Sequence, residues 1–99
     1  MNAVLRTTVF DKWLSKLKDL RGRALLIKRI RSAERGKLGD CDSVGADVLE
    51  MRIHFGPGYR LYFCKRDDSE IILLLGGTKG TQRRDLVKAR ALAKDILEN

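Results

Sequence analysis

The feature that most constrains the fold is a stretch in which apolar and polar residues alternate on either side of a glycine-proline-glycine turn. The apolar members are Leu49, Met51, Ile53 and Phe55 before the turn, and Leu61 and Phe63 after it. Successive side chains of a β-strand point to opposite faces, so the alternation predicts half-buried strands at residues 48–55 and 59–66. Glycine accepts positive φ and proline fixes its own, so residues 56–58 favour a tight turn. The stretch therefore predicts an antiparallel hairpin with one apolar and one polar face.

The segments around this hairpin predict further strands and several helices. We expect strands at residues 4–7, near 43–44 and at 70–75, and helices from Thr7 or Thr8 to about Leu20, from about Arg23 to Glu34 and over 83–99. Residues 71–75 are all apolar, which is typical of a central strand covered at least in part on both sides. Gly22 is expected to separate the first two helices, and residues 76–82 (GGTKGTQ) to form a glycine-rich loop.

The order of these segments predicts the α+β class, with helices packed against one face of a mostly antiparallel sheet. A chain of 99 residues suits a single domain, 1–99, with one modest core. The longest apolar run is far too short to cross a bilayer, and the first residues do not resemble a secretion signal. We therefore expect a cytoplasmic protein without a membrane partner.

Composition limits the chemistry and the partners. With Cys41, Cys64 and a single histidine there are too few ligands for a structural zinc site, so we expect no metal, no cofactor and two free, buried or half-buried thiols. Lysine and arginine number 21 against 13 acidic residues, which gives a net charge of +8. This excess favours a polyanion such as nucleic acid, and an acidic protein partner is the alternative.

The polar face of the hairpin carries the candidate catalytic residues. Alternation places five side chains on it, with Lys79 at its rim: Glu50, Arg52, His54, Arg60 and Tyr62. The set suits RNA cleavage by 2′-hydroxyl attack, which needs a base, an acid and cations for the phosphorane charge. Glu50 or His54 would be the base and His54 or Tyr62 the acid. The cations would be Arg52, Arg60 and Lys79, and no carboxylate cluster favours a metal route.

Each of these residues also has a structural interpretation. His54 can be a surface residue, Arg52 can pair with Glu50, and Tyr62 can pack its ring with the hydroxyl in water. Candidate RNA-binding residues lie on the helices: Lys28, Arg31 and Arg35 on the basic outer face of the second helix, and Gln82 and Arg83 at the start of the last one.

Four segments carry a family resemblance over nearly the whole chain: LEMRIHFGPGYRLYF, LLLGGTKGTQRRDLVKA, FDKWLSKLKD and RALLIKRIRSAERGKLGD. They resemble the phage-derived Gp49-like, HigB-type branch of the RelE/ParE toxin superfamily. The resemblance implies a RelE-like fold, in which an N-terminal helical hairpin packs on a twisted, mostly antiparallel sheet with a C-terminal helix. It also implies the toxin of a type II toxin-antitoxin module, a ribosome-dependent endonuclease that cuts mRNA without a metal and so inhibits translation.

The resemblance also implies partners and site residues. The partners would be the ribosome, mRNA and a cognate helix-turn-helix antitoxin, through which alone operator DNA is bound. Arg60 matches the arginine used against the scissile phosphate, and Arg52, His54 and Lys79 fall where other basic residues contribute. The last helix has no tyrosine or histidine to complete the site, so Tyr62 is a substitute and the general acid and base stay open. Two alternatives share the fold: a ParE-like inhibitor of DNA gyrase without nuclease activity, and an inactive binding partner or corepressor.

Overall fold

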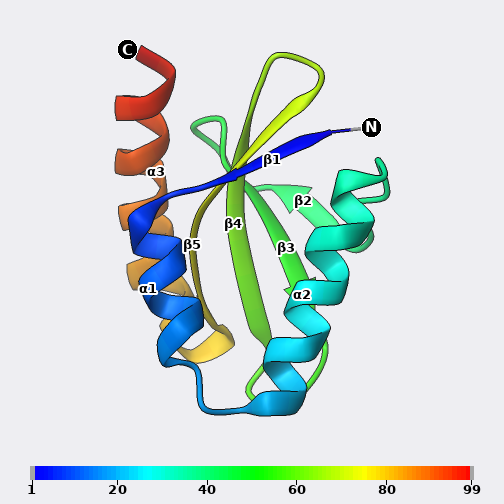
Figure 1. Cartoon of the computed structure of the whole chain (residues 1–99). Coiled ribbons are helices and arrows are strands. Elements are labelled where there is room, and N and C mark those ends of the chain that lie inside the picture. Colours follow the sequence, from blue (N-terminus) through cyan, green and yellow to red (C-terminus); the bar gives the residue numbers. More distant parts are fainter. Residues whose placement is uncertain (1, 99) are drawn as a thin grey trace.

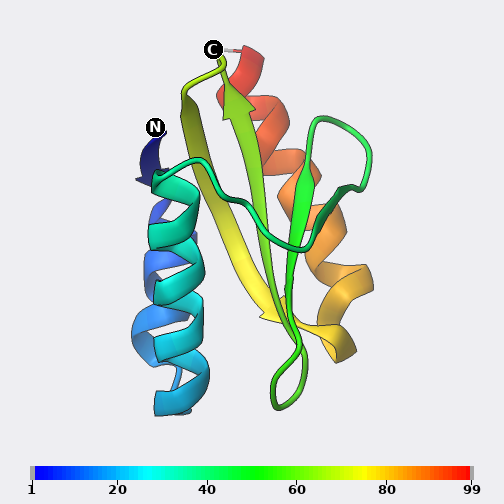
Figure 2. The same cartoon turned by 90° about the vertical axis from the view of Figure 1, so that its right-hand side faces the viewer.

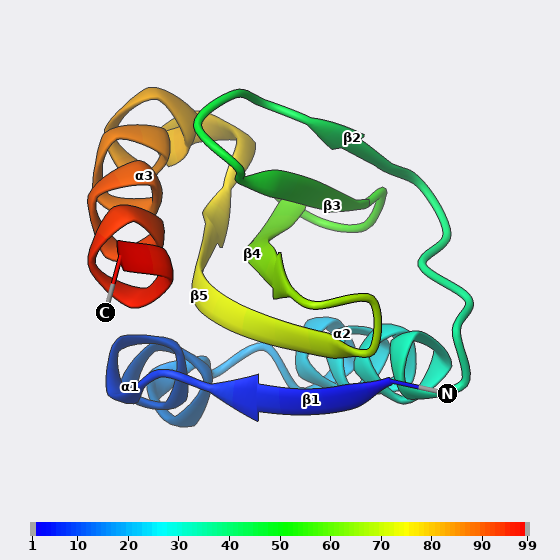
Figure 3. The ribbon, with the colours of Figure 1, turned by 90° about the horizontal axis from the view of Figure 1, so that it is seen from above.

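The chain folds around a curved sheet of five strands with helices on both of its faces (Figures 1 and 3). The computed structural model describes residues 2–98. In chain order the elements are β1 (Ala3–Arg6), α1 (Thr8–Lys16), α2 (Leu20–Glu34), β2 (Cys41–Ser43), β3 (Leu49–Ile53), β4 (Tyr59–Arg66), β5 (Glu70–Thr78), the 3₁₀ turn η1 (Lys79–Thr81) and α3 (Gln82–Glu98). The strand order is β1-β5-β4-β3-β2, and only β1 runs parallel to its neighbour. The predicted α+β class is confirmed.

The predicted hairpin is β3 and β4, in a register that places Arg52 opposite Arg60. Its apolar face packs against α1 and α2, with Met51, Leu61 and Phe63 fully buried in the first hydrophobic core. The alternation therefore assigned this face correctly. Because β3 ends at Ile53, His54 lies beyond the strand.

The second face of the sheet is covered by α3, so the prediction that all helices pack on one face is wrong. Figure 2 shows α2 and α3 on opposite sides of the strands. Tyr62, Cys64 and Leu74 form a second hydrophobic core with Ala89 and Ala93 of α3. The small alanine side chains let the helix lie close to the sheet, which buries the part of the polar face that β4 contributes.

The boundary between the first two helices lies at residues 17–19 and not at Gly22 as predicted. The Asp19 carboxylate accepts from the Gly22 amide at 3.0 Å and so caps α2. Gly22 is helical, and a Cβ there would lie 2.4 Å from the ring of Tyr59. Its role is thus to admit an aromatic ring. Thr7, one of the two predicted caps, accepts from the Phe10 amide at 3.0 Å.

The predicted glycine-rich loop is mostly strand, because β5 continues to Thr78. Gly76 pairs with Leu61, and Gly77 pairs with Arg60. A Cβ on Gly76 would lie 2.3 Å from the Trp13 ring, and one on Gly77 would lie 1.9 Å from the Asp85 carboxylate. The two glycines therefore let α1 and α3 contact the β5 backbone from opposite faces.

Both cysteines are free thiols, as predicted: Cys41 is half-buried and Cys64 is buried, and burial raises the pKa of the Cys64 thiol. Among residues 2–98, no helix combines the length and the apolar character needed to cross a membrane.

Candidate functional site

Arg52 lies at the centre of a row of charges across β2, β3 and β4. Its Nη2 is 2.8 Å from Asp40 Oδ1 and 2.7 Å from Asp42 Oδ2, and its Nη1 is 3.3 Å from Glu50 Oε1. The hydrogen bonds to Asp40 and Asp42 raise its pKa further. The alternative that Arg52 pairs with Glu50 is therefore present in the structure. Because three carboxylates surround the Arg52 guanidinium, its attraction for a phosphate is weak.

Arg60 is the buried cation of the row, with 7% of its surface exposed. Its Nη1 donates to the carbonyl oxygens of Gly58 at 3.3 Å and Tyr59 at 3.2 Å. Its Nε is 3.9 Å from Glu50 Oε1 and has no hydrogen-bond partner. A buried guanidinium with an unused donor is costly unless a ligand completes it. Arg60 is therefore the strongest candidate for an anion ligand.

Glu50 joins the two arginines to the start of α3. It is 1% exposed, and its Oε2 accepts from Gln82 Nε2 at 2.6 Å while its Oε1 faces Arg52 and Arg60. Both oxygens are thus engaged, which favours a role in holding Arg60 over a role as a base. Gln82, predicted to bind RNA, contributes to the same network.

Tyr62 lies opposite Glu50 on β4 but is completely buried under α3. Its hydroxyl has no hydrogen-bond partner, and burial together with the nearby Glu50 charge raises its pKa well above the usual value. The expectation that the Tyr62 hydroxyl lies on an open face is wrong. The reason is that α3 covers this part of the sheet.

His54 follows β3 and is the exposed end of the network. Its side chain is 73% exposed, and its Nε2 lies 2.6 Å from Asp40 Oδ2. Arg52 and, after it, His54 lower the pKa of the Asp40 carboxyl to about 2. Asp40 thus holds the imidazole ring and also holds Arg52.

This ion-pair network predicts an acid-sensitive contribution to stability. The pKa of Asp40 is about 2 in the folded chain, against about 3.9 when unfolded. The contribution is therefore complete above the unfolded value and is lost as the pH falls through the folded one. Urea unfolding of the protein and of Asp40→Asn checks this. We expect a clear difference in unfolding free energy at neutral pH that shrinks as the pH approaches 2, and an undiminished difference there would contradict it.

Lys79 and Arg60 both lie close to Gly58 in the hairpin turn. Gly58 has φ of +77°, and a Cβ there would lie 3.3 Å from Lys79 Cβ and 3.5 Å from Arg60 Nη1. The Lys79 amide donates to the Gly58 carbonyl at 2.8 Å, which fixes η1 against the hairpin turn. The turn that the sequence predicted thus brings two of the predicted cations together.

The predicted RNA-binding residues do not form one surface. Arg83 is exposed in the first turn of α3, on the side of the sheet that carries Arg60. Lys28, Arg31 and Arg35 lie on α2 or at its end, against the other face. Lys28 approaches the site only at its margin, where it lines a hollow with Arg52 and His54.

Several residues of the network were not predicted from the sequence. They are Asp40 and Asp42, which bind Arg52, and Arg29, whose Nη1 donates to the Arg52 carbonyl at 2.6 Å. Apart from this network, the buried Asp85 accepts from the Thr81 hydroxyl at 2.5 Å. The only local signal was the spacing of Asp40 and Asp42 around Cys41, which places both carboxylates on one face of a strand.

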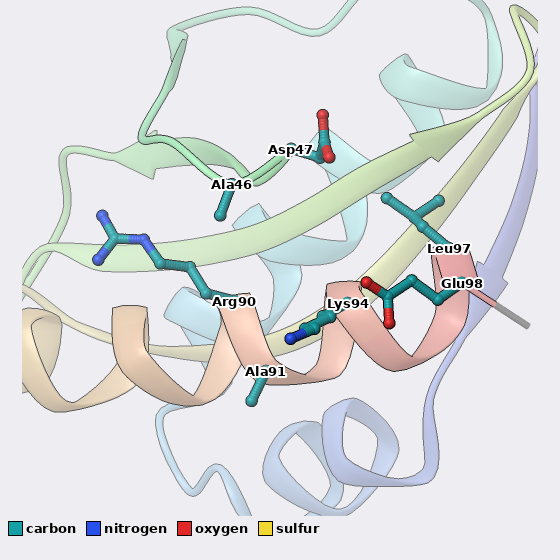
Figure 4. Close-up of a pocket in the computed structure, with 7 residues that line it drawn as sticks. All are labelled: Ala46, Asp47, Arg90, Ala91, Lys94, Leu97 and Glu98. Carbon is teal, nitrogen blue, oxygen red and sulfur yellow. The ribbon is translucent and has the colours of Figure 1, made fainter.

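A separate hollow lies between the C-terminal half of α3 and the loop before β3, and Figure 4 shows the side chains around it. Its lining residues are Ala46, Asp47, Arg90, Ala91, Lys94, Leu97 and Glu98. None of the predicted site residues is among them. In the part of the chain that the structure describes, no three histidine, cysteine or acidic side chains are grouped to hold a metal ion.

The chain matches a known family model and is similar to a known protein. Residues 12–97 match the family model described as "Phage derived protein Gp49-like (DUF891)". The chain is also similar to an uncharacterized protein of Haemophilus influenzae, with 42% identity over 97 residues that cover 97% of this chain and 98% of the relative. The matched region includes the whole hairpin, η1 and most of α3, and so contains the candidate site.

Proposed function

Because the chain belongs to the phage-derived Gp49-like family, which is related to toxin-antitoxin modules, we propose that it is a toxin that cleaves mRNA on the ribosome. The observation that carries this proposal is Arg60, a guanidinium 7% exposed with an unused Nε donor beside Lys79. The net charge of +8 favours the same class of ligand. The partners of the proposed toxin would be the ribosome, mRNA and a cognate helix-turn-helix antitoxin. Only the antitoxin would contact operator DNA.

The proposed reaction is an internal transfer at one phosphodiester. The 2′-oxygen attacks the adjacent phosphorus, and the bond from phosphorus to the 5′-oxygen breaks. The products are a 2′,3′-cyclic phosphate and a 5′-hydroxyl. A base takes the 2′-proton and an acid supplies a proton to the 5′-oxygen. Cations stabilise the additional negative charge on the phosphorane.

Arg60 and Lys79 are the proposed phosphate ligands. The planar guanidinium can contact two phosphate oxygens at once, whereas the lysine ammonium acts as a point charge. Glu50 and Arg52 act as positioning residues, because each is held by several partners within the network. Glu50 Oε1, 3.9 Å from Arg60 Nε, holds the Arg60 side chain in position.

His54 is the favoured proton carrier. It is exposed, and Asp40 Oδ2 lies 2.6 Å from its Nε2 and so orients the imidazole ring. The other predicted carriers, Glu50 and Tyr62, are buried beneath α3 and would have to move to reach RNA. The exposed Arg83 would extend the basic surface along the mRNA. The basic outer face of α2 would contact ribosomal RNA.

The test is cleavage of a defined mRNA by the purified protein in a reconstituted translation reaction. We expect a cut at the codon in the ribosomal A site, with a 2′,3′-cyclic phosphate on the upstream fragment. Once the position is known, a matched mRNA with 2′-deoxyribose on the 5′ side of the scissile bond serves as the control. That substrate should stay intact, because it lacks the nucleophile. Equal cleavage of both substrates would rule out 2′-hydroxyl attack.

A further inference from the structure

A groove of about 450 Å³ lies between α1 and α3, apart from the network around Arg60. Both helices pack against β5, and Figure 3 shows them next to each other when the molecule is seen from above. The groove is lined by Val9, Lys12, Trp13, Leu75, Gly76, Arg84, Asp85 and Lys88. Its floor is thus part of β5, and its two walls come from different ends of the chain.

The floor of the groove is a strand edge without a neighbour. β1 pairs with β5 only from Glu70 to Leu73, and the Thr7 hydroxyl then donates to the Leu74 carbonyl at 2.6 Å. Beyond that point, no strand within residues 2–98 lies on this side of β5. Leu75 and the Trp13 ring give the floor and one wall an apolar surface.

The rim of the groove is positive. Lys12 comes from α1, and Arg84 and Lys88 come from α3, all of them exposed. Arg84 Nε lies 3.6 Å from Asp85 Oδ1, whereas neither lysine has a carboxylate within 4 Å in the part of the chain described. Three cations around an apolar floor are complementary to a ligand that has both acidic and apolar side chains.

We propose that this groove binds an acidic segment of a protein partner, with an apolar side chain of the segment against Trp13 and Leu75. That the partner is the protein which neutralises the toxin rests on the proposed function. Gly76 packs against one side of the Trp13 ring, which leaves less of the indole free for stacking on an RNA base.

Trp13 is the single tryptophan in the chain, so its fluorescence reports binding in the groove directly. The probe is a short synthetic peptide of alternating glutamate and leucine, titrated into the full chain. A glutamine-leucine peptide tests the role of charge, and oligouridine tests nucleic acid as the occupant. We expect the acidic peptide alone to shift the emission in a saturable manner that weakens as salt is added.

Two charge-reversal variants locate the site. The triple variant Lys12→Glu, Arg84→Glu, Lys88→Glu should bind the acidic peptide at least about tenfold more weakly. The matched control, Lys16→Glu, Lys37→Glu, Lys65→Glu, changes the net charge equally outside the groove and should bind nearly as well as the original. Circular dichroism verifies that both variants fold. Equal loss in the two variants, no response to the peptide, or a response to oligouridine alone would overturn the proposal. Since binding is measured without RNA cleavage, failure here leaves the nuclease activity to be judged separately.

Discussion

Replacement of Arg60 by lysine is expected to reduce the rate of ribosome-dependent mRNA cleavage by about 10²–10³-fold. Lysine keeps the positive charge beside Glu50 but removes the planar fork that can hold two phosphate oxygens. The loss should therefore appear mainly in the rate of cleavage. Single-turnover cleavage of the defined mRNA measures this rate. Arg60→Ala should be equally inactive, but it also removes a buried partner of Glu50 and so is expected to be less stable.

The matched control is Arg66→Lys on the same strand. Arg66 is exposed at the far end of β4, where its Nε pairs with Glu70 Oε1 at 2.5 Å. This variant should cleave mRNA at the original rate. Urea unfolding should show that Arg60→Lys stays folded under the assay conditions. A folded Arg60→Lys protein with full activity would remove the guanidinium from the mechanism.

Replacement of Gly76 by alanine is expected to lower the free energy of unfolding by about 2–3 kcal/mol. The new Cβ would lie 2.3 Å from two atoms of the Trp13 ring, and that ring packs in turn against Phe10 and Tyr59. The indole cannot move away without disturbing the core. Chemical denaturation followed by circular dichroism gives the free energy of unfolding, and Trp13 fluorescence should show that its environment has changed.

Gly80→Ala is the control for this substitution. A Cβ at Gly80 would meet only Thr78 Oγ1, at 3.7 Å. Its backbone does not have positive φ either. We therefore expect a change of less than about 1 kcal/mol. If the two alanine variants were equally stable, the contact between Trp13 and the β5 backbone would not be needed for the fold.

The sequence predicted the hairpin and its first core well because alternation along a strand is a local property. Met51, Leu61 and Phe63 occupy every second position of their strands, and strand geometry therefore turns all three side chains toward the core. The sequence did not predict the second core. Alternation of apolar and polar residues does not show whether the polar face of a strand lies in solvent or under a helix. Tyr62 was classified as polar and exposed, yet α3 completely buries it.

The candidate site was predicted in part for a similar reason. Glu50, Arg52 and Arg60 share one face through strand register, which the sequence contains. The contacts of Arg52 with Asp40 and Asp42 depend on the pairing of β2 with β3, and the sequence does not specify the register of that pairing. Gly76 and Gly77 looked like loop residues, although the structure uses them for close contacts with Trp13 and Asp85.

The measurement that tests the central proposal most directly is the mapping of mRNA ends in cells after brief induction of the protein. We expect growth to stop together with cuts in translated messages, in register with the reading frame, and with 5′-hydroxyl ends downstream. Cells that express Arg60→Lys at the same level should keep intact messages and continue to grow. Growth arrest with full-length mRNA would contradict RNA cleavage, and a loss of DNA supercoiling in those cells would indicate gyrase as the target.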